Sequence, residues 1–435
     1  MDGIKQKIGR LPGVSALKRE VHARQTGARL AEAEKEIDRR LAEKTSKGEK
    51  INVVFVCHRP AVWGALRSVY EALAADDHFK VTIVAIPNKK QLPGLGLNHE
   101  QYESEGAEAF WKEYGCINGY NYETGEWLDL KSLAPDYLFF QQPYNITRCE
   151  AYRSEVVSGY AKIGYVCYFT PYEFGPFYNE CLPEDFLKDV SFFFSQNKTD
   201  DQYIKNRVKS VNHGATKVIL TGYPKYDVEK NYADLNQQNR SRGEKFSVIW
   251  TPRWTTNEGF CHFFEYRDRI LEYTDHHPEV NLTFRPHPQA FLEWTGTGEL
   301  TEEELADYLR NIERRDNLHL NQAGDYFPML YASDCLLTDV SSLIYDYLLT
   351  GKPIVLCMPQ NIEHYLQDVL DGLYKVSSWD EATAVLEKLQ KGEDSLYGVR
   401  QKIVAERMNI SKEGAGKKIA EILSADAMDH WDQVH

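Results

Sequence analysis

The chain has 435 residues, with 51 Lys and Arg against 65 Asp and Glu, and a formal net charge of −14. This length predicts two or three domains, and the 42% of apolar residues exclude disorder for most of the chain. The acidic balance excludes a general nucleic-acid-binding protein, because phosphate neutralisation needs a surplus of Lys and Arg. No apolar run approaches the ~18 residues of a membrane-spanning helix, and the N-terminus lacks the apolar stretch of a secretory signal. The eight cysteines form no Cys-x-x-Cys pair, so we expect reduced thiols and a cytoplasmic protein.

The first 50 residues differ from the rest of the chain in charge. They carry 13 Lys and Arg against 8 Asp and Glu, a net charge of +5, which leaves −19 for the remainder. Helix-forming residues dominate from Ser15 to Lys44, and Leu30, Ile37 and Leu41 form a narrow apolar stripe at helical spacing. Two interpretations stay open: a solvated helix that packs lightly or pairs with a second copy of the chain, and a basic helix that lies on an anionic membrane. The interleaved acidic residues favour the first interpretation.

From residue 51 the sequence alternates between apolar runs and stretches with helical spacing. Ile51–Cys57 is a continuous apolar run, as expected for a strand buried on both faces of a parallel sheet. The other strands predicted in this half are Phe79–Ile86, Tyr137–Gln142, Lys162–Phe169, Val190–Ser195 and Lys217–Gly222. The helices predicted between them lie near residues 60–75, 99–113, 148–158 and 198–209. This alternation predicts a doubly wound α/β sheet.

Residues 228–245 are polar and predict an interdomain linker, after which a second alternating series begins. Its predicted strands are Ser247–Trp250, Asn281–Phe284, Leu318–Leu320, Cys335–Thr338 and Pro353–Cys357. Its predicted helices lie near 261–275, 302–312, 325–332, 342–349, 379–391, 397–408 and 412–424. The sequence thus predicts two Rossmann-like domains in a GT-B-like arrangement, preceded by a helical segment. The predicted boundaries are 1–50, 51–235, 246–400 and, for C-terminal helices that pack back across the domains, 401–435.

The strongest candidate site lies within the segment Cys335–Cys357, which reads as strand, polar turn, helix and strand. Thr338, Asp339, Ser341 and Ser342 stand where the first strand gives way to the helix. This is the carboxyl end of a parallel strand, where α/β proteins bind their ligands. Ser341 or Ser342 can cap the helix, whose N-terminal N–H groups suit a pyrophosphate. A capped turn without a ligand is the alternative interpretation.

Two other predicted strands of the same half also end in cations. NLTFRPHP, residues 281–288, carries Arg285 and His287 between prolines, and VIWTPRWT, residues 248–255, carries Arg253. Arginine offers a fork of donors to phosphate oxygens, and histidine can donate to a phosphate or move a proton near neutral pH. A surface arginine and a structural histidine are the alternative. Because parallel strands end at the same sheet edge, we expect the three sets of polar groups to converge.

The order of four segments resembles the CDP-glycerol glycerophosphotransferase family, which includes teichoic-acid polyol-phosphate primases and polymerases and their capsule relatives. The segments are GYPKYD, VIWTPRWT, FRPHP and LLTDVSSLIYDYLLTGKPIV, within roughly residues 190–360. The resemblance implies a donor of the form CDP-polyol, held mainly by the C-terminal domain, with the acceptor on the N-terminal domain. It matches Arg285 and His287 to an Arg-x-His-Pro segment. The donor-binding residues that we expect are Arg253, which replaces a Thr of the family, Arg285, His287, Thr338, Asp339, Ser341, Ser342 and Asp346.

The N-terminal half departs from the family at the expected catalytic base. The family carries Trp-His-Gly-Thr-Pro, whose His is the expected base, whereas the comparable stretch here, YVCYFTPYEF at residues 165–174, has no His. Glu173 in this stretch and His58 after the first strand are the two catalytic candidates, since either can take a hydroxyl proton. A core or capping histidine is the alternative for His58. Arg59 is expected to hold a phosphate of the acceptor.

The expected reaction is phosphoryl transfer. An acceptor hydroxyl attacks the β-phosphorus of a CDP-polyol carrying glycerol phosphate or ribitol phosphate, and CMP leaves. No Asp-x-Asp motif or His/Cys cluster demands a metal, so neither a metal nor a cofactor is predicted. The expected acceptor is a lipid-linked or glycan precursor of a cell-wall or capsule polymer, and the basic N-terminal segment would hold the enzyme at the inner face of the plasma membrane. The alternatives are a GT-B glycosyltransferase that uses a nucleotide sugar and a scaffold that has lost its base.

Overall fold

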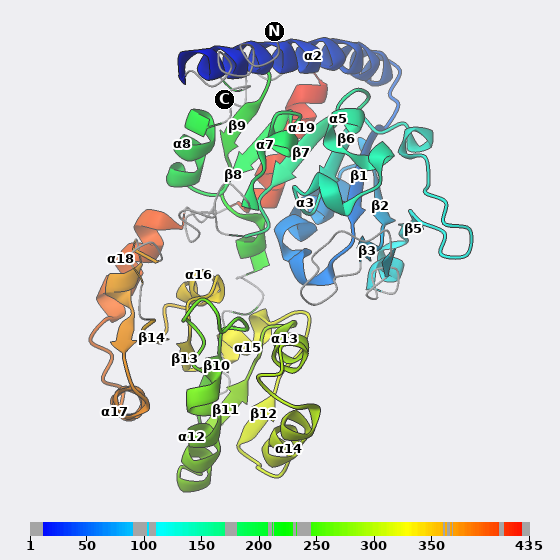
Figure 1. Ribbon diagram of the computed structural model, residues 1–435. Helices are drawn as coiled ribbons and strands as arrows, with labels where there is room; N and C mark the ends of the chain where they lie inside the picture. Colours follow the sequence, from blue (N-terminus) through cyan, green and yellow to red (C-terminus); the bar gives the residue numbers. More distant parts are fainter. Residues whose placement is uncertain are drawn as a thin grey trace.

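The computed structural model contains two parallel β-sheets with helices on their faces, and a long helix at the N-terminal end (Figure 1). The structure describes residues 12–89, 102–103, 110–169, 181–207, 213–228, 245–359, 369–408 and 413–428, together with residues 211, 232, 362, 366 and 367. Glu173 and most of the predicted linker lie outside the described residues. The α/β class and the two Rossmann-like domains in a GT-B arrangement, preceded by a helical segment, are confirmed.

The first sheet has seven parallel strands in the order β5-β2-β1-β6-β7-β8-β9. Its strands are β1 (Ile51–Cys57), β2 (Phe79–Ala85), β5 (Ile117–Asn118), β6 (Tyr137–Phe140), β7 (Lys162–Val166), β8 (Phe192–Ser195) and β9 (Lys217–Leu220). The main helices beside it are α3 (Gly64–Ala74), α5 (Ser154–Val157), α7 (Glu184–Leu187) and α8 (Lys198–Arg207). The helix predicted near residues 99–113 is wrong at Tyr102–Glu103, which forms strand β4 and pairs with β3 (Asn88–Lys89).

The second sheet has six parallel strands in the order β12-β11-β10-β13-β14-β15. Its strands are β10 (Phe246–Thr251), β11 (Val280–Phe284), β12 (Leu318–Leu320), β13 (Cys335–Thr338), β14 (Ile354–Cys357) and β15 (Tyr374–Val376). Its helices are α12 (Phe263–His276), α13 (Ala290–Gly296), α14 (Glu302–Glu313), α15 (Phe327–Ala332), α16 (Leu343–Leu348), α17 (Trp379–Gln390) and α18 (Tyr397–Arg407). The sequence did not predict β15 and α13, which are only three and seven residues long.

The last helix, α19 (Ala415–Ala427), returns from the second domain to pack against α3 of the first (Figure 1). Its first two N–H groups, from Ala415 and Gly416, each donate to the carboxylate of Asp227 at 2.8 Å. Gly416 packs so closely on Ser68 that a Cβ atom would lie 2.4 Å from the Ser68 carbonyl carbon. Asp227 belongs to the GYPKYD segment, so this segment caps the helix that joins the end of the chain to its first domain.

Helix α2 (Pro12–Ser46) lies across the end of the first domain that is farthest from the second (Figure 1). Leu30, Ile37 and Leu41, the predicted apolar stripe, are at most 1% exposed. The stripe is therefore covered by the protein's own first domain and cannot lie on a membrane in this structure. Within the part of the chain that the structure describes, no helix combines the length and the apolar character that crossing a membrane would require.

Buried ion pairs fix this helix to the amino ends of the strands. Arg40 and Lys44 reach the carboxylate of Asp136 at 2.9 and 2.5 Å, and Asp136, which is fully buried, also accepts the N–H of Asn52. Lys162 at the start of β7 contacts Asp38 of α2 and Asp426 of α19. Arg40 and Lys44 of α2 thus serve an internal purpose, on the side of the sheet opposite to the carboxyl ends of its strands.

Replacing Asp136 by Asn should destabilise the protein by about 3 kcal/mol, because two cations lose a buried partner. Urea unfolding measures the free energy of unfolding. The matched control is Glu36→Gln, which breaks an exposed ion pair with Arg39 within the same helix and should leave the free energy of unfolding almost unchanged. Equal losses in the two variants would contradict the assignment of Asp136 as the anchor of α2.

Candidate functional site

The carboxyl ends of β10, β11 and β13 bring the three predicted motifs to one edge of the second sheet. The register pairs Trp250 with Phe284 and Thr251 with Thr338, so the three strands end at the same level. Backbone hydrogen bonds continue beyond the strands, since the N–H of Arg285 donates to the Trp250 carbonyl at 2.9 Å and that of Asp339 to Thr251 at 3.2 Å. The predicted convergence of these motifs is therefore a feature of the structure.

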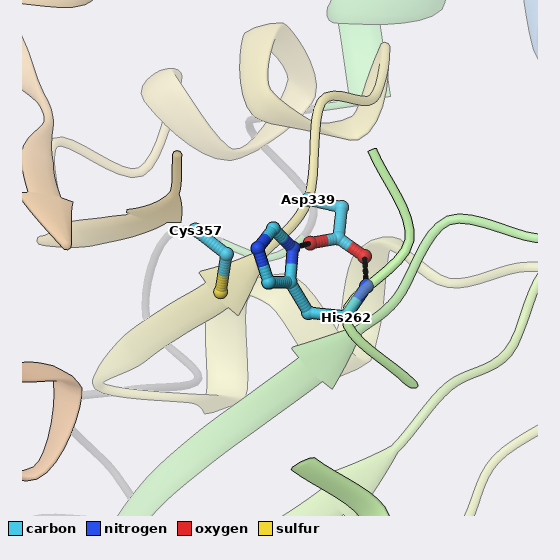
Figure 2. A group of neighbouring side chains, drawn as sticks. All are labelled: His262, Asp339 and Cys357. Carbon is cyan, nitrogen blue, oxygen red and sulfur yellow. Dashed lines mark hydrogen bonds and ion pairs between the residues drawn. The ribbon is translucent and has the colours of Figure 1, made fainter. Parts of the chain in front are cut away.

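Asp339 organises this edge from within. Its carboxylate accepts the backbone N–H groups of Arg253 at 2.7 Å and His262 at 3.0 Å, and it bonds the His262 ring through Nδ1 at 2.6 Å (Figure 2). Only 1% of Asp339 is exposed, and its carboxylate holds together the loops that carry Arg253 and His262. Burial opposes the positive form of His262, but the hydrogen bond and charge of Asp339 outweigh it and raise the pKa of His262. His262 is not among the predicted site residues. Its position directly before α12 is the one feature of the sequence that could have indicated it.

Cys357, at the end of β14, completes a group with His262 and Asp339 whose ligand atoms lie within 4.8 Å of one another (Figure 2). Histidine, carboxylate and thiolate are ligands that zinc accepts. Here, however, three donors already occupy the carboxylate of Asp339, and burial, aided by the charge of Asp339, raises the pKa of the Cys357 thiol well above its usual range. His262 and Asp339 therefore form a hydrogen-bonded pair, and the Cys357 thiol lies beside it.

His287 presents a hydrogen-bond donor at the edge of the sheet. The backbone N–H of Gln289 donates to Nδ1 at 3.2 Å, which places the ring proton on Nε2. The indole of Trp254 stacks on the imidazole at 5.2 Å between ring centroids. Part of His287 is accessible to water. Burial of the rest, together with Arg253, Arg59 and Arg285, lowers its pKa to about 4, so the ring is neutral near pH 7.

The three arginines that act on His287 come from both domains. Arg59 follows β1 of the first domain and contacts Asn88 at 3.4 Å. Arg253 pairs with Glu258 at 2.7 Å. Arg285 donates to the Asn321 side chain and to the Ala323 carbonyl and lies over the ring of Tyr326. A cationic group thus forms where the two domains face each other.

Other predicted donor-binding side chains are used inside the protein. The hydroxyl of Thr338 is fully buried between the hydroxyl and carbonyl of Thr251, and Asp346, which is 2% exposed, bonds Lys225 and Tyr326. The polar atoms of Thr338, Asp339 and Asp346 thus have protein partners, and direct contact of these residues with the donor stays a prediction. Ser341 and Ser342 are accessible, and it is the Ser341 hydroxyl that accepts the N–H of Leu343 at the start of α16.

His58 lies in a hydrogen-bonded network at the carboxyl end of β1. Its Nε2 bonds the Gln142 side chain at 2.8 Å, and the N–H groups of His58 and Arg59 donate to Gln141 at 2.7 and 2.9 Å. Burial, opposed only in part by the Gln142 bond, lowers the pKa of His58 to about 3. Such a ring takes up a hydroxyl proton poorly near pH 7, so this environment suits the positioning of Arg59 better than a base. The other candidate, Glu173, lies outside the described residues.

The low pKa of His58 makes stability depend on pH. An unfolded chain binds a proton on this ring below about pH 6.5, whereas the folded chain binds it only near pH 3. Stability contributed by the neutral ring is thus present above pH 6.5 and is lost as the pH falls, by roughly 1.4 kcal/mol per unit. His58→Gln should flatten the stability profile between pH 6 and 4, measured by urea unfolding at each pH. Identical slopes in the two proteins would contradict the buried neutral ring.

Replacing Asp339 by Asn should lower the pKa of His262, because burial then acts without the opposing carboxylate. An NMR titration of the imidazole signals measures the change. Asp334→Asn is the matched control, since Asp334 accepts the N–H of Ser247 at the other end of strands β10 and β13, away from His262. A His262 pKa that is the same in wild type and Asp339→Asn would contradict the pairing in Figure 2.

Solved structures of similar fold include two groups of enzymes. The wall teichoic acid polymerase TagF aligns with a TM-score of 0.55 and 13% identity over 94% of this chain and 97% of that one. A TagF variant soaked with CDPG aligns with 0.53 and 12%, over 94% and 98%. The UDP-GlcNAc 2-epimerase of Neisseria meningitidis bound to UDP-GlcNAc aligns with 0.52 and 12%, over 87% and 100%. At these identities the likeness shows the shared fold.

The sequence itself matches one family model. Residues 183–380 match the family described as CDP-glycerol:poly(glycerophosphate) glycerophosphotransferase, whereas comparison with curated proteins gives no match. The matched residues contain all four segments on which the resemblance rests, including the strand ends that carry Arg253, Arg285 and His287. Over residues 183–380, somewhat less than half of the chain, the sequence is thus similar to the CDP-glycerol glycerophosphotransferases.

Proposed function

We propose that this protein transfers a polyol phosphate, either glycerol phosphate or ribitol phosphate, from a CDP-activated donor to a hydroxyl of a lipid-linked or glycan acceptor. CMP is released, and the product extends a cell-wall polymer. The family match over residues 183–380 supports the class of donor. The observation that carries the proposal is the convergence of Arg253, Arg285 and His287 at one edge of the second sheet, with Arg59 of the first domain near enough to act on the charge of His287.

Arg59, Arg253, Arg285 and His287 together supply the kind of cations and hydrogen-bond donors that bind a diphosphate. Three guanidinium groups offset the negative charges of the two phosphates, which the otherwise acidic chain would repel. The Nε2–H of His287 adds a donor whose direction is fixed by the Gln289 N–H on Nδ1 and by the stacked Trp254. The accessible hydroxyls of Ser341 and Ser342 lie on the turn that follows the neighbouring strand, β13. Preorganised donors of this kind stabilise the charge of a phosphoryl-transfer transition state.

In the proposed reaction, an acceptor hydroxyl oxygen forms a bond to the β-phosphorus of the donor. The bond from that phosphorus to the bridging oxygen breaks in line, and CMP leaves with the electron pair. Arg253, Arg285 and His287 hold the diphosphate, and Arg59 approaches from the acceptor-binding domain. The base that takes the hydroxyl proton stays a prediction, with Glu173 and His58 as its two candidates.

A donor panel tests the substrate class. The protein is incubated with CDP-glycerol, CDP-ribitol or UDP-GlcNAc, each with membranes that contain wall-polymer precursors, and released nucleotide is measured. We expect CMP only from a CDP-polyol, and only with the acceptor present. Thermal shift with the same donors should show stabilisation by the CDP-polyol alone. Turnover of UDP-GlcNAc would instead indicate the glycosyltransferase, and donor binding without turnover would indicate a scaffold.

Arg285→Ala and His287→Ala should each lower kcat/KM for the CDP-polyol by about 100-fold, because each removes one preorganised donor to the phosphates. The matched control is Arg269→Ala, which removes an exposed cation from α12 of the same domain. Steady-state CMP release measures the three variants. Full activity in Arg285→Ala and His287→Ala would contradict the proposed phosphate site.

A further inference from the structure

A buried ion pair joins the two domains beside the proposed phosphate site. Lys225 lies in the short 3-10 helix η8 (Pro224–Val228) at the end of the first domain, and its Nζ contacts the carboxylate of Asp346 in α16 at 2.7 Å. Asp346 is 2% exposed and the Lys225 side chain 15% exposed. The neighbours of Lys225 in the chain, Tyr223 and Tyr226, share one apolar cluster with residues of α15 and α16. The pair is therefore largely shielded from water.

Tyr326 connects this ion pair to Arg285. Its hydroxyl donates to the same Asp346 oxygen that Lys225 contacts, also at 2.7 Å. Burial and the charge of Asp346 raise the pKa of Tyr326 well above its usual range, so the hydroxyl stays a donor. The guanidinium of Arg285 lies over the Tyr326 ring, with its central carbon 5.0 Å from the ring centroid. One side chain thus contacts both the interdomain pair and a proposed phosphate ligand.

The remaining contacts of Arg285 lead to the same segment. Within the described residues, its guanidinium donates to the Asn321 side chain and to the Ala323 carbonyl, both just before Tyr326. Tyr232, which also precedes the second domain in the chain, holds the segment at a second point. Its hydroxyl donates to Asp325 at 3.0 Å. The segment 321–326 is therefore held by residues that precede the second domain, and it holds Arg285.

We propose that Lys225 and Tyr326 are positioning residues through which the contact between the two domains sets the place of Arg285 in the donor site. The proposal rests on the proposed function, in which Arg285 binds the donor diphosphate. If Lys225 loses its charge, Asp346 keeps a buried negative charge with one fewer partner, and Tyr326 is held less firmly, while the Asn321 N–H still bonds the Phe284 carbonyl. Arg285 then has a less fixed position from which to meet the phosphates, although it touches neither Lys225 nor Asp346.

A double-mutant cycle tests this connection with CDP as the probe, measured by titration calorimetry on the full chain. We expect Arg285→Ala to weaken CDP binding about 100-fold and Lys225→Met about tenfold. In the double variant, the loss should equal that of Arg285→Ala alone, because Lys225 acts through Arg285. Lys225→Arg, which keeps the charge, should restore most of the affinity, and Lys205→Met is the control, since Lys205 forms an exposed pair within α8.

Tyr326→Phe gives a milder second test, because it removes only the hydroxyl and keeps the ring under Arg285. We expect it to raise KM for the CDP-polyol about fivefold with little change in kcat, while circular dichroism confirms the fold. Independent, additive losses in Lys225→Met and Arg285→Ala would overturn the connection and leave the proposed function standing, as would an unaltered KM in Tyr326→Phe. Failure of the wild-type protein to bind CDP would overturn both.

Discussion

The carboxylate of Asp339 is the contact on which the proposed site depends. It accepts the backbone N–H groups of Arg253 and His262, and it forms a hydrogen bond with Nδ1 of the His262 ring. These bonds join the ends of β10 and β13 to the start of α12. A buried carboxylate needs this number of donors, since an unpaired charge away from water is costly. The loop that carries Arg253 is thereby fixed relative to β13, and the loop after β11 is fixed through the Arg285 N–H on Trp250. The buried carboxylate of Asp339 thus helps to set the position of Arg253 at the accessible edge of the sheet.

Most of the fold could be predicted from the sequence, because strands buried on both faces are continuous apolar runs. Ile51–Cys57 is the clearest case, with bounds that the structure reproduces. Elements that are short or exposed gave no such signal. Tyr374–Val376 has only one buried residue, and the two-residue strand Tyr102–Glu103 pairs outside the main sheet, within a stretch whose sequence predicts a helix.

The site was predicted less completely, because a motif gives a residue's place along the chain but not the direction of its side chain. Arg253, Arg285 and His287 follow strand ends and meet at one edge, as their positions predicted. Asp339 and Asp346 occur in the same motifs, yet their carboxylates turn inward to partners far away in the sequence. Nothing in the local sequence of Asp346 indicates Lys225, which is 121 residues away. His58 similarly follows the first strand, but Gln142, 84 residues later, takes its Nε2.

The position of Lys162 has a consequence for how the protein is made. This lysine is 2% exposed at the start of β7, and its partners are Asp38, near the beginning of the chain, and Asp426, near its end. Asp227 likewise receives the first N–H groups of α19. A ribosome delivers the first domain long before residues 415–427 exist, so Lys162 then has Asp38 but not Asp426, and Asp227 has no helix to cap. The first domain therefore completes its fold only after synthesis of the second, and a truncated chain that ends before α19 leaves the first domain unfinished.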